Sequence, residues 1–273
     1  MRLEIFNVEH GQCALLTDDS GNRMLIDCGH NSTTGWRPSL HLRRLGVDEI
    51  DALIITNSDE DHASDLHNLR REVRIKALYR NKTVSGTDLY HLKGQDGPGD
   101  GIAALCDMIG TYTHPLSKQP DFEGLSIKTF RNAYPADFDD ENNLSLVTIL
   151  RWPNFAICFP GDMERAGWLK LLEQPAFRTE ISNMTIFVAS HHGRENGCCE
   201  ELYKVTGLNP YLTIISDGGK QYATQETVNW YASRTIGIDL YGRKRKVLTT
   251  RSDGDISIDI TSTAVTVSTS TRA

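Results

Sequence analysis

The sequence predicts an α/β fold (α+β in some classifications), in which mixed β-sheets are covered by helices. Strands and helices alternate along the chain in two comparable halves. Apolar runs such as residues 52–55 and 155–159 have strand length, whereas residues 62–72 and 163–173 place apolar side chains at helical spacing. Three of the apolar strands end in Asp or His, which indicates polar groups gathered at one edge of a sheet.

The first half begins with a meander of three strands, and the second half ends with three strands that complete a second sheet. The predicted strands span residues 2–8, 12–18, 22–28, 52–56, 75–80, 126–130, 144–152, 155–159, 184–190, 211–216, 247–251, 256–260 and 264–267. The predicted helices span residues 36–46, 62–72, 163–173 and 225–234, and a further helical stretch ends near residue 113. Pro153-Asn154 is expected to form the turn between two of the strands.

Length and composition predict one large domain over residues 1–267, followed by a loose tail over residues 268–273. The 273 residues are 39% hydrophobic, which is enough for a substantial core, and no Pro-, Gly- or Ser-rich linker divides them. No apolar run approaches eighteen residues, and a strand begins directly at the N-terminus. We therefore expect neither a membrane span nor a signal peptide, and a cytoplasmic protein.

The six cysteines indicate a reducing compartment, because several lie inside apolar strands as small buried side chains rather than in a disulfide framework. Cys198-Cys199 follows a histidine pair closely enough to suggest metal ligation. The start of a helix is the favoured interpretation, because Glu200 and Glu201 come next.

The turn after the strand at residues 52–55 carries a candidate metal site. Asp59, Asp61 and His62 offer three ligands within four residues, and a turn that leaves a strand can direct all three at one point. The alternative for Asp61 is the N-cap of a helix over residues 63–71.

Two later segments strengthen the prediction of a metal site. Asp162 follows the apolar strand that ends at Phe159, and His191-His192 follows the strand over residues 184–190. Each segment alone has an ordinary structural explanation, a turn in the first case and a hydrogen-bonded pair in the second. Together, and in this order, they predict one shared metal site.

The order of these motifs resembles the metallo-β-lactamase fold superfamily, and within it the branch related to the hydrolase domain of the competence protein ComEC. The resemblance rests on Asn57, Asp59, Asp61 and His62, on Gly161-Asp162, and on His191-His192-Gly193. The segments over residues 6–14 and 25–29 also resemble the opening of that branch. The resemblance covers residues 1–260 and implies an αββα sandwich of two mixed β-sheets and a metal-dependent hydrolase domain.

The resemblance implies that one metal is held by Asp61, His62 and either His191 or His192, with Asp162 as a carboxylate that bridges to a second metal. The metal set of the predicted site is therefore Asp59, Asp61, His62, Asp162 and His191. The second position would use Asn57 and Asp59, with no evident histidine, so one or two divalent ions are expected. Zn²⁺ or Mn²⁺ fits the set, and the second position favours Mn²⁺ or Mg²⁺.

The expected chemistry is hydrolysis by a metal-bound hydroxide, because a bound cation lowers the pKa of water to about 7. Asp61 and Asp162 would hold the centre, and His192 would either protonate the leaving group or support His191. Asn57 and Arg194 are the predicted substrate contacts. The branch favours a phosphodiester substrate, which could be DNA, RNA or a small nucleotide.

The net charge of the chain and the ligand residues missing from the motifs leave other functions open. The formal net charge of −7 gives no overall attraction for nucleic acid, although Arg243-Lys244-Arg245-Lys246 is a local basic cluster. A second hypothesis is a hydrolase of the same fold that acts on a non-nucleotide ester, thioester or amide. A third is a non-catalytic binding module, suggested by Asn57 and the missing third histidine. Partner chains cannot be predicted from the sequence.

Overall fold

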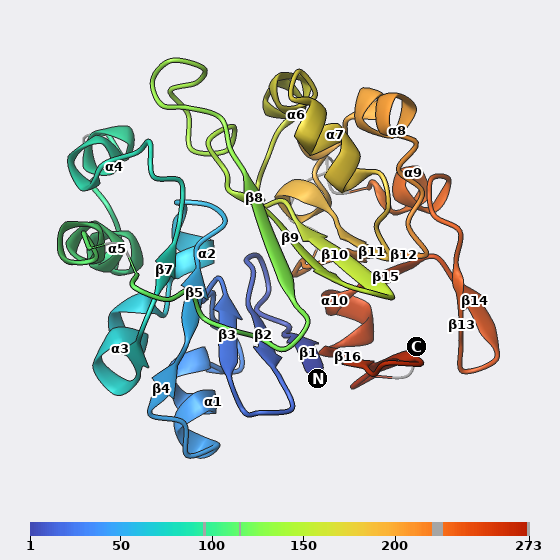
Figure 1. Cartoon of the computed structure of the whole chain (residues 1–273), viewed down its shortest axis with the longest axis horizontal. Coiled ribbons are helices and arrows are strands. Elements are labelled where there is room, and N and C mark those ends of the chain that lie inside the picture. The colour runs from blue at the N-terminus through green and yellow to red at the C-terminus, as the bar shows by residue number, and fades with distance from the viewer. Residues whose placement is uncertain (95–96, 115, 220–225, 272–273) are drawn as a thin grey trace.

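The computed structural model describes residues 1–94, 97–114, 116–219 and 226–271, and it confirms the predicted fold class. Two mixed β-sheets face one another, and helices cover the outer face of each (Figure 1). The first sheet has the strand order β17-β16-β1-β2-β3-β5-β7, and the second has the order β15-β12-β11-β10-β9-β8. Among the described residues, no helix is long and apolar enough to cross a membrane.

The strands of the first sheet are β1 (Arg2–Ile5), β2 (Ala14–Thr17), β3 (Arg23–Ile26), β5 (Ala52–Ile54), β7 (Leu78–Tyr79), β16 (Ile256–Ile260) and β17 (Val265–Thr269). Those of the second sheet are β8 (Ser126–Phe130), β9 (Val147–Trp152), β10 (Phe155–Phe159), β11 (Ile186–Val188), β12 (Leu212–Ile215) and β15 (Val247–Thr249). Two small pairs join β4 (Glu49–Ile50) to β6 (Arg74–Ile75), and β13 (Ile238–Leu240) to β14 (Arg243–Arg245).

The first sheet is covered by α1 (Pro38–Arg44), α2 (Glu60–Ala63), α3 (Leu66–Glu72), α4 (Gly86–Leu92) and α5 (Asp100–Thr111). The second sheet is covered by α6 (Arg165–Leu171), α7 (Pro175–Ile181), α8 (Glu200–Thr206) and α9 (Val228–Ala232). The short helix α10 (Thr250–Asp253) follows β15, and two 3₁₀ turns, η1 (Ser190–Gly193) and η2 (Glu195–Gly197), follow β11.

Strand β10 shows why the sandwich forms, because both of its faces are buried. Phe155, Ile157 and Phe159 pack between the two sheets. Ala156 and Cys158, which point the other way, pack against the helices of the second sheet. A strand buried on both faces is apolar at every position, as this one is. As expected of small buried side chains outside a disulfide framework, all six cysteines are free and four of them are buried.

Three expectations about the elements need correction. The helix predicted over residues 62–72 divides into α2 and α3, because the buried Asp65 carboxylate between them accepts a hydrogen bond from Ser39 N at 2.9 Å in α1. The helix predicted over residues 163–173 is shorter and is followed by α7, which begins at Pro175. The tail is not loose from residue 268, since Ser268 and Thr269 pair with β16 in an extended β17. Residues 225 and 272–273 lie outside the described residues.

Candidate metal centre

The polar motifs follow parallel strands, whose carboxyl ends meet at one edge of the sandwich. Strand β5 pairs in parallel with β3, and β10 pairs in parallel with β11. The turn after β5 carries Asp61 and His62, β10 leads to Asp162, and β11 leads to His192. The candidate ligands were expected at the edge of one sheet. In the structure, Asp61 and His62 follow a strand of the first sheet, whereas Asp162 and His192 follow strands of the second sheet, so the four side chains meet between the two sheets.

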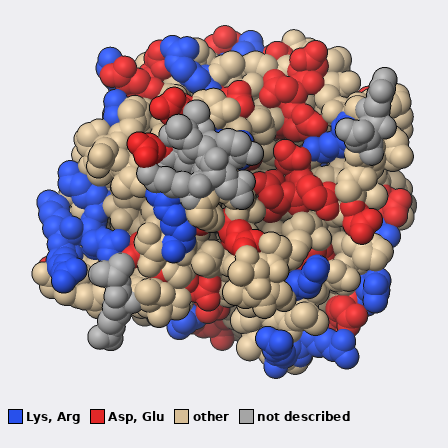
Figure 2. Space-filling view, turned by 180° about the vertical axis from the view of Figure 1, so that it is seen from behind, with Lys and Arg blue, Asp and Glu red and all other residues tan. Residues whose placement is uncertain are grey.

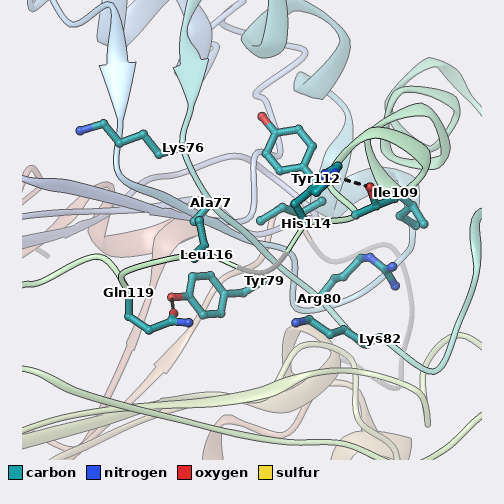
Figure 3. Close-up of a pocket in the computed structure, with 12 residues that line it drawn as sticks. Lys76, Ala77, Tyr79, Arg80, Lys82, Ile109, Tyr112, His114, Leu116 and Gln119 are labelled. Carbon is teal, nitrogen blue, oxygen red and sulfur yellow. Dashed lines mark hydrogen bonds between the residues drawn. The ribbon is translucent and has the colours of Figure 1, made fainter.

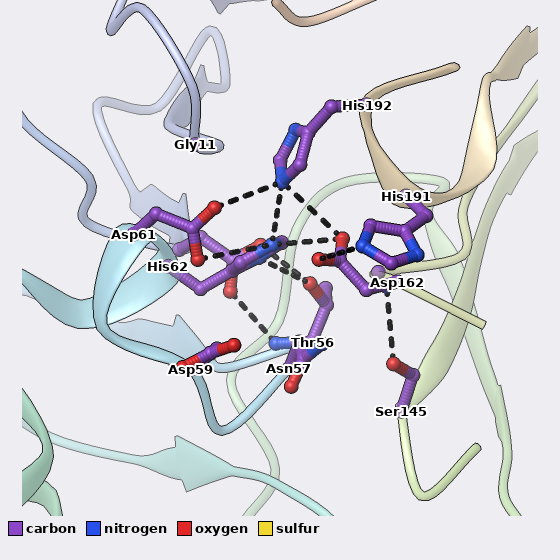
Figure 4. Close-up of polar contacts among 12 residues, drawn as sticks. Gly11, Thr56, Asn57, Asp59, Asp61, His62, Ser145, Asp162, His191 and His192 are labelled. Atoms are coloured by element: carbon purple, nitrogen blue, oxygen red, sulfur yellow. Dashed lines mark hydrogen bonds and ion pairs between the residues drawn. The ribbon is translucent and has the colours of Figure 1, made fainter. Parts of the chain in front are cut away.

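Four side chains converge at this edge (Figure 4). Asp162 Oδ1 lies 3.0 Å from His62 Nε2 and 3.3 Å from His192 Nε2, and the two Nε2 atoms lie 3.2 Å apart. Asp61 Oδ2 lies 3.1 Å from His192 Nε2. We call Asp61, His62, Asp162 and His192 the convergent group. Three of its side chains are almost fully buried, whereas the Asp61 side chain is 32% exposed, so a substrate would approach from the side of Asp61.

A buried carboxylate fixes the orientation of His62. Asp27 follows β3, is completely buried, and accepts hydrogen bonds from His62 Nδ1 at 2.9 Å and from Thr56 N at 2.7 Å. The Thr56 hydroxyl donates to the same carboxylate. Because Nδ1 carries the proton that Asp27 accepts, the lone pair of Nε2 can face the convergent group. Carboxylate–histidine pairs of this kind orient metal ligands in many proteins.

His192 is oriented in the same way by a backbone carbonyl. Its Nδ1 donates to Ser216 O at 2.9 Å, at the end of β12, and its Nε2 therefore points at the convergent group. His191 and His192 both have a φ of 51°, in the left-handed region. Such backbone costs roughly 1–3 kcal/mol for each non-glycine residue and is typical of functional sites. The consecutive left-handed residues turn the chain sharply and send the two imidazoles in different directions.

The backbones of the two acidic members are also fixed by close packing. A Cβ on Gly11 or on Gly29 would come within 2.4 Å of Asp61 O, so only glycine at these two positions lets the Asp61 backbone sit where it does. Asp162 N donates to Ser145 Oγ at 3.1 Å. The positions of Asp61 and Asp162 therefore depend on residues in the segments that flank β2, β3 and β9 as well as on their own turns.

The convergent group is strongly charged. Burial lowers the pKa of His62, but the Asp162 and Asp27 carboxylates outweigh it and raise that pKa well above its ordinary value. For His192, burial is likewise outweighed by Asp162, and the pKa rises to about 10. Burial raises the pKa of Asp162, but His192 and His62 hold it well below its ordinary value. Ionised side chains this close together are a chemical environment in which a divalent cation can replace protons.

The geometry fits a metal ion. For tetrahedral zinc with bonds of about 2.0–2.1 Å, the ligand atoms stand about 3.3–3.4 Å apart. Four contacts among these donors, at 3.0 to 3.3 Å, are close to that spacing, whereas Asp61 Oδ1 lies 4.0 Å from His62 Nε2. A cavity of about 10 Å³ lies against His62, Asp162 and His192, which is near the lower limit for one water molecule. Two imidazoles and two carboxylates suit Zn²⁺ or Mn²⁺.

The remaining predicted residues lie beside the convergent group, and we call Asn57, Asp59, His191 and Arg194 the flanking group. Asp59 caps α2, where its side chain accepts from Glu60 N, and it lies apart from the four converging side chains in Figure 4. Its carboxylate binds Lys93 Nζ at 2.9 Å. The helix N-cap suggested for Asp61 is therefore Asp59. Within the described residues, Asp59 does not join the group of converging donors.

The other flanking residues also bind protein atoms. His191 Nε2 accepts from Arg194 Nη1 at 3.2 Å and lies 3.8 Å from Asp162 Oδ2. Asn57 Nδ2 donates to Asn142 Oδ1 at 3.1 Å. Of the two histidines, the structure thus brings His192 into the convergent group and leaves His191 beside it.

Sequence reasoning missed the residues that orient the ligands. Asp27 was noted only as part of a motif, although an Asp directly after an apolar strand was a usable signal. Ser216 acts through its backbone carbonyl, so its side chain gives no signal. Cys198 and Cys199 do not belong to the convergent group, and Cys199 is the N-cap of α8, as the favoured interpretation requires.

A larger pocket of about 470 Å³ lies beside the edge strand β7 and shares no residue with the convergent group (Figure 3). Three of its polar side chains already have protein partners. Lys76 Nζ pairs with a carboxylate oxygen at 2.8 Å, the Tyr79 hydroxyl donates to an amide oxygen at 2.6 Å, and the Tyr112 hydroxyl donates to a backbone carbonyl at 2.7 Å. This pocket therefore does not compete with the convergent group as the candidate site.

A family model described as the metallo-beta-lactamase superfamily matches residues 7–152. The chain belongs to this superfamily. Its members are generally hydrolases. The matched part contains Asp27, Asp61 and His62, and the structure adds Asp162 and His192 from beyond it.

Individual relatives are distant. ComE operon protein 3 from Bacillus subtilis (strain 168) is 25% identical over 212 residues, which cover 72% of this chain and 25% of that protein. The chain therefore matches about a quarter of the length of this relative. Zn²⁺-bound PqqB from Methylobacterium extorquens is 12% identical with a TM-score of 0.51, over 95% of this chain and 100% of that chain. YhfI from Bacillus subtilis is 12% identical with a TM-score of 0.47, over 94% and 99%. At these identities, the solved structures share the fold alone.

Proposed function

We propose that this protein is a metal-dependent phosphodiesterase whose centre is the convergent group. The observation that carries the proposal is the meeting of two carboxylates and two imidazoles at one point, with ligand spacings close to those of a tetrahedral metal site. Membership of a superfamily that is generally hydrolytic supports hydrolysis as the reaction. The resemblance of the motifs to the ComEC-like branch favours a phosphodiester over other esters.

A divalent cation bound here would make water acidic enough to supply hydroxide at neutral pH and would withdraw charge from a substrate oxygen. The residues of the chain hold and orient this centre. Asp61 occupies the exposed side of the centre, where the substrate arrives. Asp162 is buried and contacts both His62 and His192. His192 uses Nδ1 to bind Ser216 O and presents Nε2 to the centre, so we assign it as a ligand rather than as the acid that protonates the leaving group.

Arg194 supports a phosphate substrate. Its guanidinium binds His191, which in turn lies beside Asp162, so a fixed positive charge stands next to the centre. The planar guanidinium matches two oxygens of a phosphate, which makes arginine the usual residue for such contacts. A carboxylic ester or amide has no comparable need for this charge, because its carbonyl is neutral before attack.

The surface charges favour a short phosphodiester. Lys and Arg side chains gather at one edge of the face in Figure 2, the edge at which Figure 1 shows β13 and β14. Acidic side chains gather nearer the middle of that face. Within the basic cluster, Arg245 pairs with Asp253 at 2.8 Å and Lys246 donates to Ala232 O, which leaves Arg243 and Lys244 as its exposed members. A long polyanion would gain little from a patch with only two exposed cations.

A substrate panel tests the proposal. The protein is stripped of metal with a chelator, reloaded with Zn²⁺ or Mn²⁺, and assayed on bis(p-nitrophenyl) phosphate, a cyclic dinucleotide, single-stranded DNA and p-nitrophenyl acetate. We expect hydrolysis of the phosphodiesters that disappears with the metal and returns on reloading. Hydrolysis of p-nitrophenyl acetate alone would overturn the phosphodiester assignment. Activity that persists after the chelator has removed the metal would overturn the metal centre.

A further inference from the structure

Lys93 lies in a partly buried ion-pair cluster beside the convergent group. It directly follows α4, and its Nζ is 2.9 Å from Asp59 Oδ1 and 3.2 Å from Glu141 Oε1. The Lys93 side chain is only 12% exposed, whereas those of Asp59 and Glu141 are 51% and 24% exposed. One ammonium therefore holds two carboxylates from segments that are far apart in the chain.

The same two segments are joined a second time, by the hydrogen bond from Asn57 Nδ2 to Asn142 Oδ1. Asn57 is 1% exposed, and among the described residues its Oδ1 has no hydrogen-bond partner. Asp59 is two residues from Asp61, which belongs to the convergent group. The two segments that Lys93 joins thus carry two carboxylates and one buried amide oxygen that has no partner among the described residues, and Lys93 neutralises part of the charge of the carboxylates.

The charge of this set depends on the lysine. Two carboxylates and one ammonium carry a net charge of −1, and without the ammonium the charge would be −2. Removing the ammonium leaves both carboxylates uncompensated, which is unfavourable for Glu141 in its mostly buried position and less so for Asp59, which is half exposed and better solvated. A divalent cation would restore the balance, and carboxylate and amide oxygens are the ligands that hard cations such as Mn²⁺ or Mg²⁺ prefer.

We propose that Lys93 limits the centre to a single cation, because its ammonium occupies the position beside Asp59 and Glu141 that a second divalent ion would otherwise take. The inference rests on the proposed metal centre and adds its stoichiometry and the residue that sets it. Lys93 is a positioning residue in this account, since it contacts neither substrate nor the convergent group. Asp59, which the sequence suggested as a ligand, is then available to metal only when the lysine is absent.

Metal content measured by elemental analysis tests the inference. Wild-type protein and the Lys93→Met, Lys93→Gln and Lys93→Arg variants are loaded with excess Mn²⁺, passed through a desalting column and analysed. Lys82→Met is the matched control, because Lys82 is exposed and has no ion pair within the part of the chain that the structure describes. Lys93→Met/Asp59→Asn removes one carboxylate together with the ammonium. Circular dichroism checks the fold of each variant, and Lys93→Gln replaces Lys93→Met if the latter does not fold.

We expect about one ion per chain in wild type, Lys93→Arg and Lys82→Met, and about two in Lys93→Met and Lys93→Gln, since these two lose the compensating charge and keep both carboxylates. The double variant should return to about one. Two ions in wild type, or one in both neutral variants, would overturn the role of Lys93 while leaving the metal centre intact. No ion in wild type would overturn the metal centre and this inference with it.

Discussion

The convergent group and the flanking group both contain Asp and His residues, yet the side chains of these residues have different partners. His62 and His192 each use Nδ1 to bind an acceptor away from the centre, which leaves Nε2 directed at Asp162. His191 instead receives a hydrogen bond from Arg194 on Nε2, and Asp59 is paired with Lys93. The difference teaches that the partner of the second ring nitrogen or of the carboxylate, rather than residue type, decides which residue can be a ligand.

The largest expected effect comes from removing the carboxylate that both histidines of the convergent group contact. Asp162→Ala should lower metal affinity and hydrolysis by more than about 100-fold, because even partners that only orient a ligand are worth about 10- to 100-fold. The fold should remain, since the side chain lies at the end of β10 rather than within a sheet. Isothermal titration with Zn²⁺ measures the metal affinity, and circular dichroism checks the fold. Unchanged turnover would refute the role of Asp162.

The two adjacent histidines give the sharpest contrast. His192→Ala should abolish tight metal binding, with a loss of more than about 100-fold, whereas His191→Ala should lose less than about tenfold, below the range for an orienting partner. The two substitutions remove side chains of the same size from neighbouring, buried positions. Each is therefore the control for the other in a zinc titration, and equal losses would contradict the distinction between the groups.

A smaller effect is expected from changing Asp27, the carboxylate that binds Nδ1 of His62. Asp27→Asn keeps the shape of the side chain but leaves one oxygen to accept from Thr56 and His62. Metal affinity should fall by about 10- to 100-fold, the usual range for such partners. Because Asp27 is completely buried, thermal unfolding must be measured in parallel. A loss of stability without a loss of metal affinity would show that Asp27 supports only the fold.

A smaller effect than that of Asp27→Asn should come from Arg194→Lys, which keeps the charge and removes the planar pair of donors. We expect KM for a phosphodiester to rise roughly tenfold, since a charged hydrogen bond contributes about 1.5–3 kcal/mol. Metal content should stay at the wild-type value. An unchanged KM would remove Arg194 from the substrate contacts, and a loss of metal would place it in the centre itself.

The sequence predicted those parts of the fold that depend on local apolar pattern. Strand β10 was expected at residues 155–159 and lies there, because all five of its residues are apolar and buried. The hairpin of β13 and β14 was missed, since Arg243–Arg245 is charged throughout and shows no apolar alternation. The break after α2 was also missed, because it depends on a hydrogen bond from Ser39, which is distant in the chain.

The candidate site was likewise predictable only where it depends on local sequence pattern. Asp61, His62 and Asp162 could be named because each follows an apolar strand. The choice between His191 and His192 could not be made, since it depends on two left-handed residues and on Ser216 O at 2.9 Å. The sequence also could not predict that Asp59 lies outside the convergent group, because its partner Lys93 is 34 residues away along the chain.

Anomalous diffraction from crystals grown with zinc tests the central claim most directly, because it locates the ion independently of activity. The account predicts a peak at about 2.0–2.2 Å from one atom each of Asp61, His62, Asp162 and His192. A peak bound instead by Asp59 or His191, or no peak in a folded protein, would contradict it.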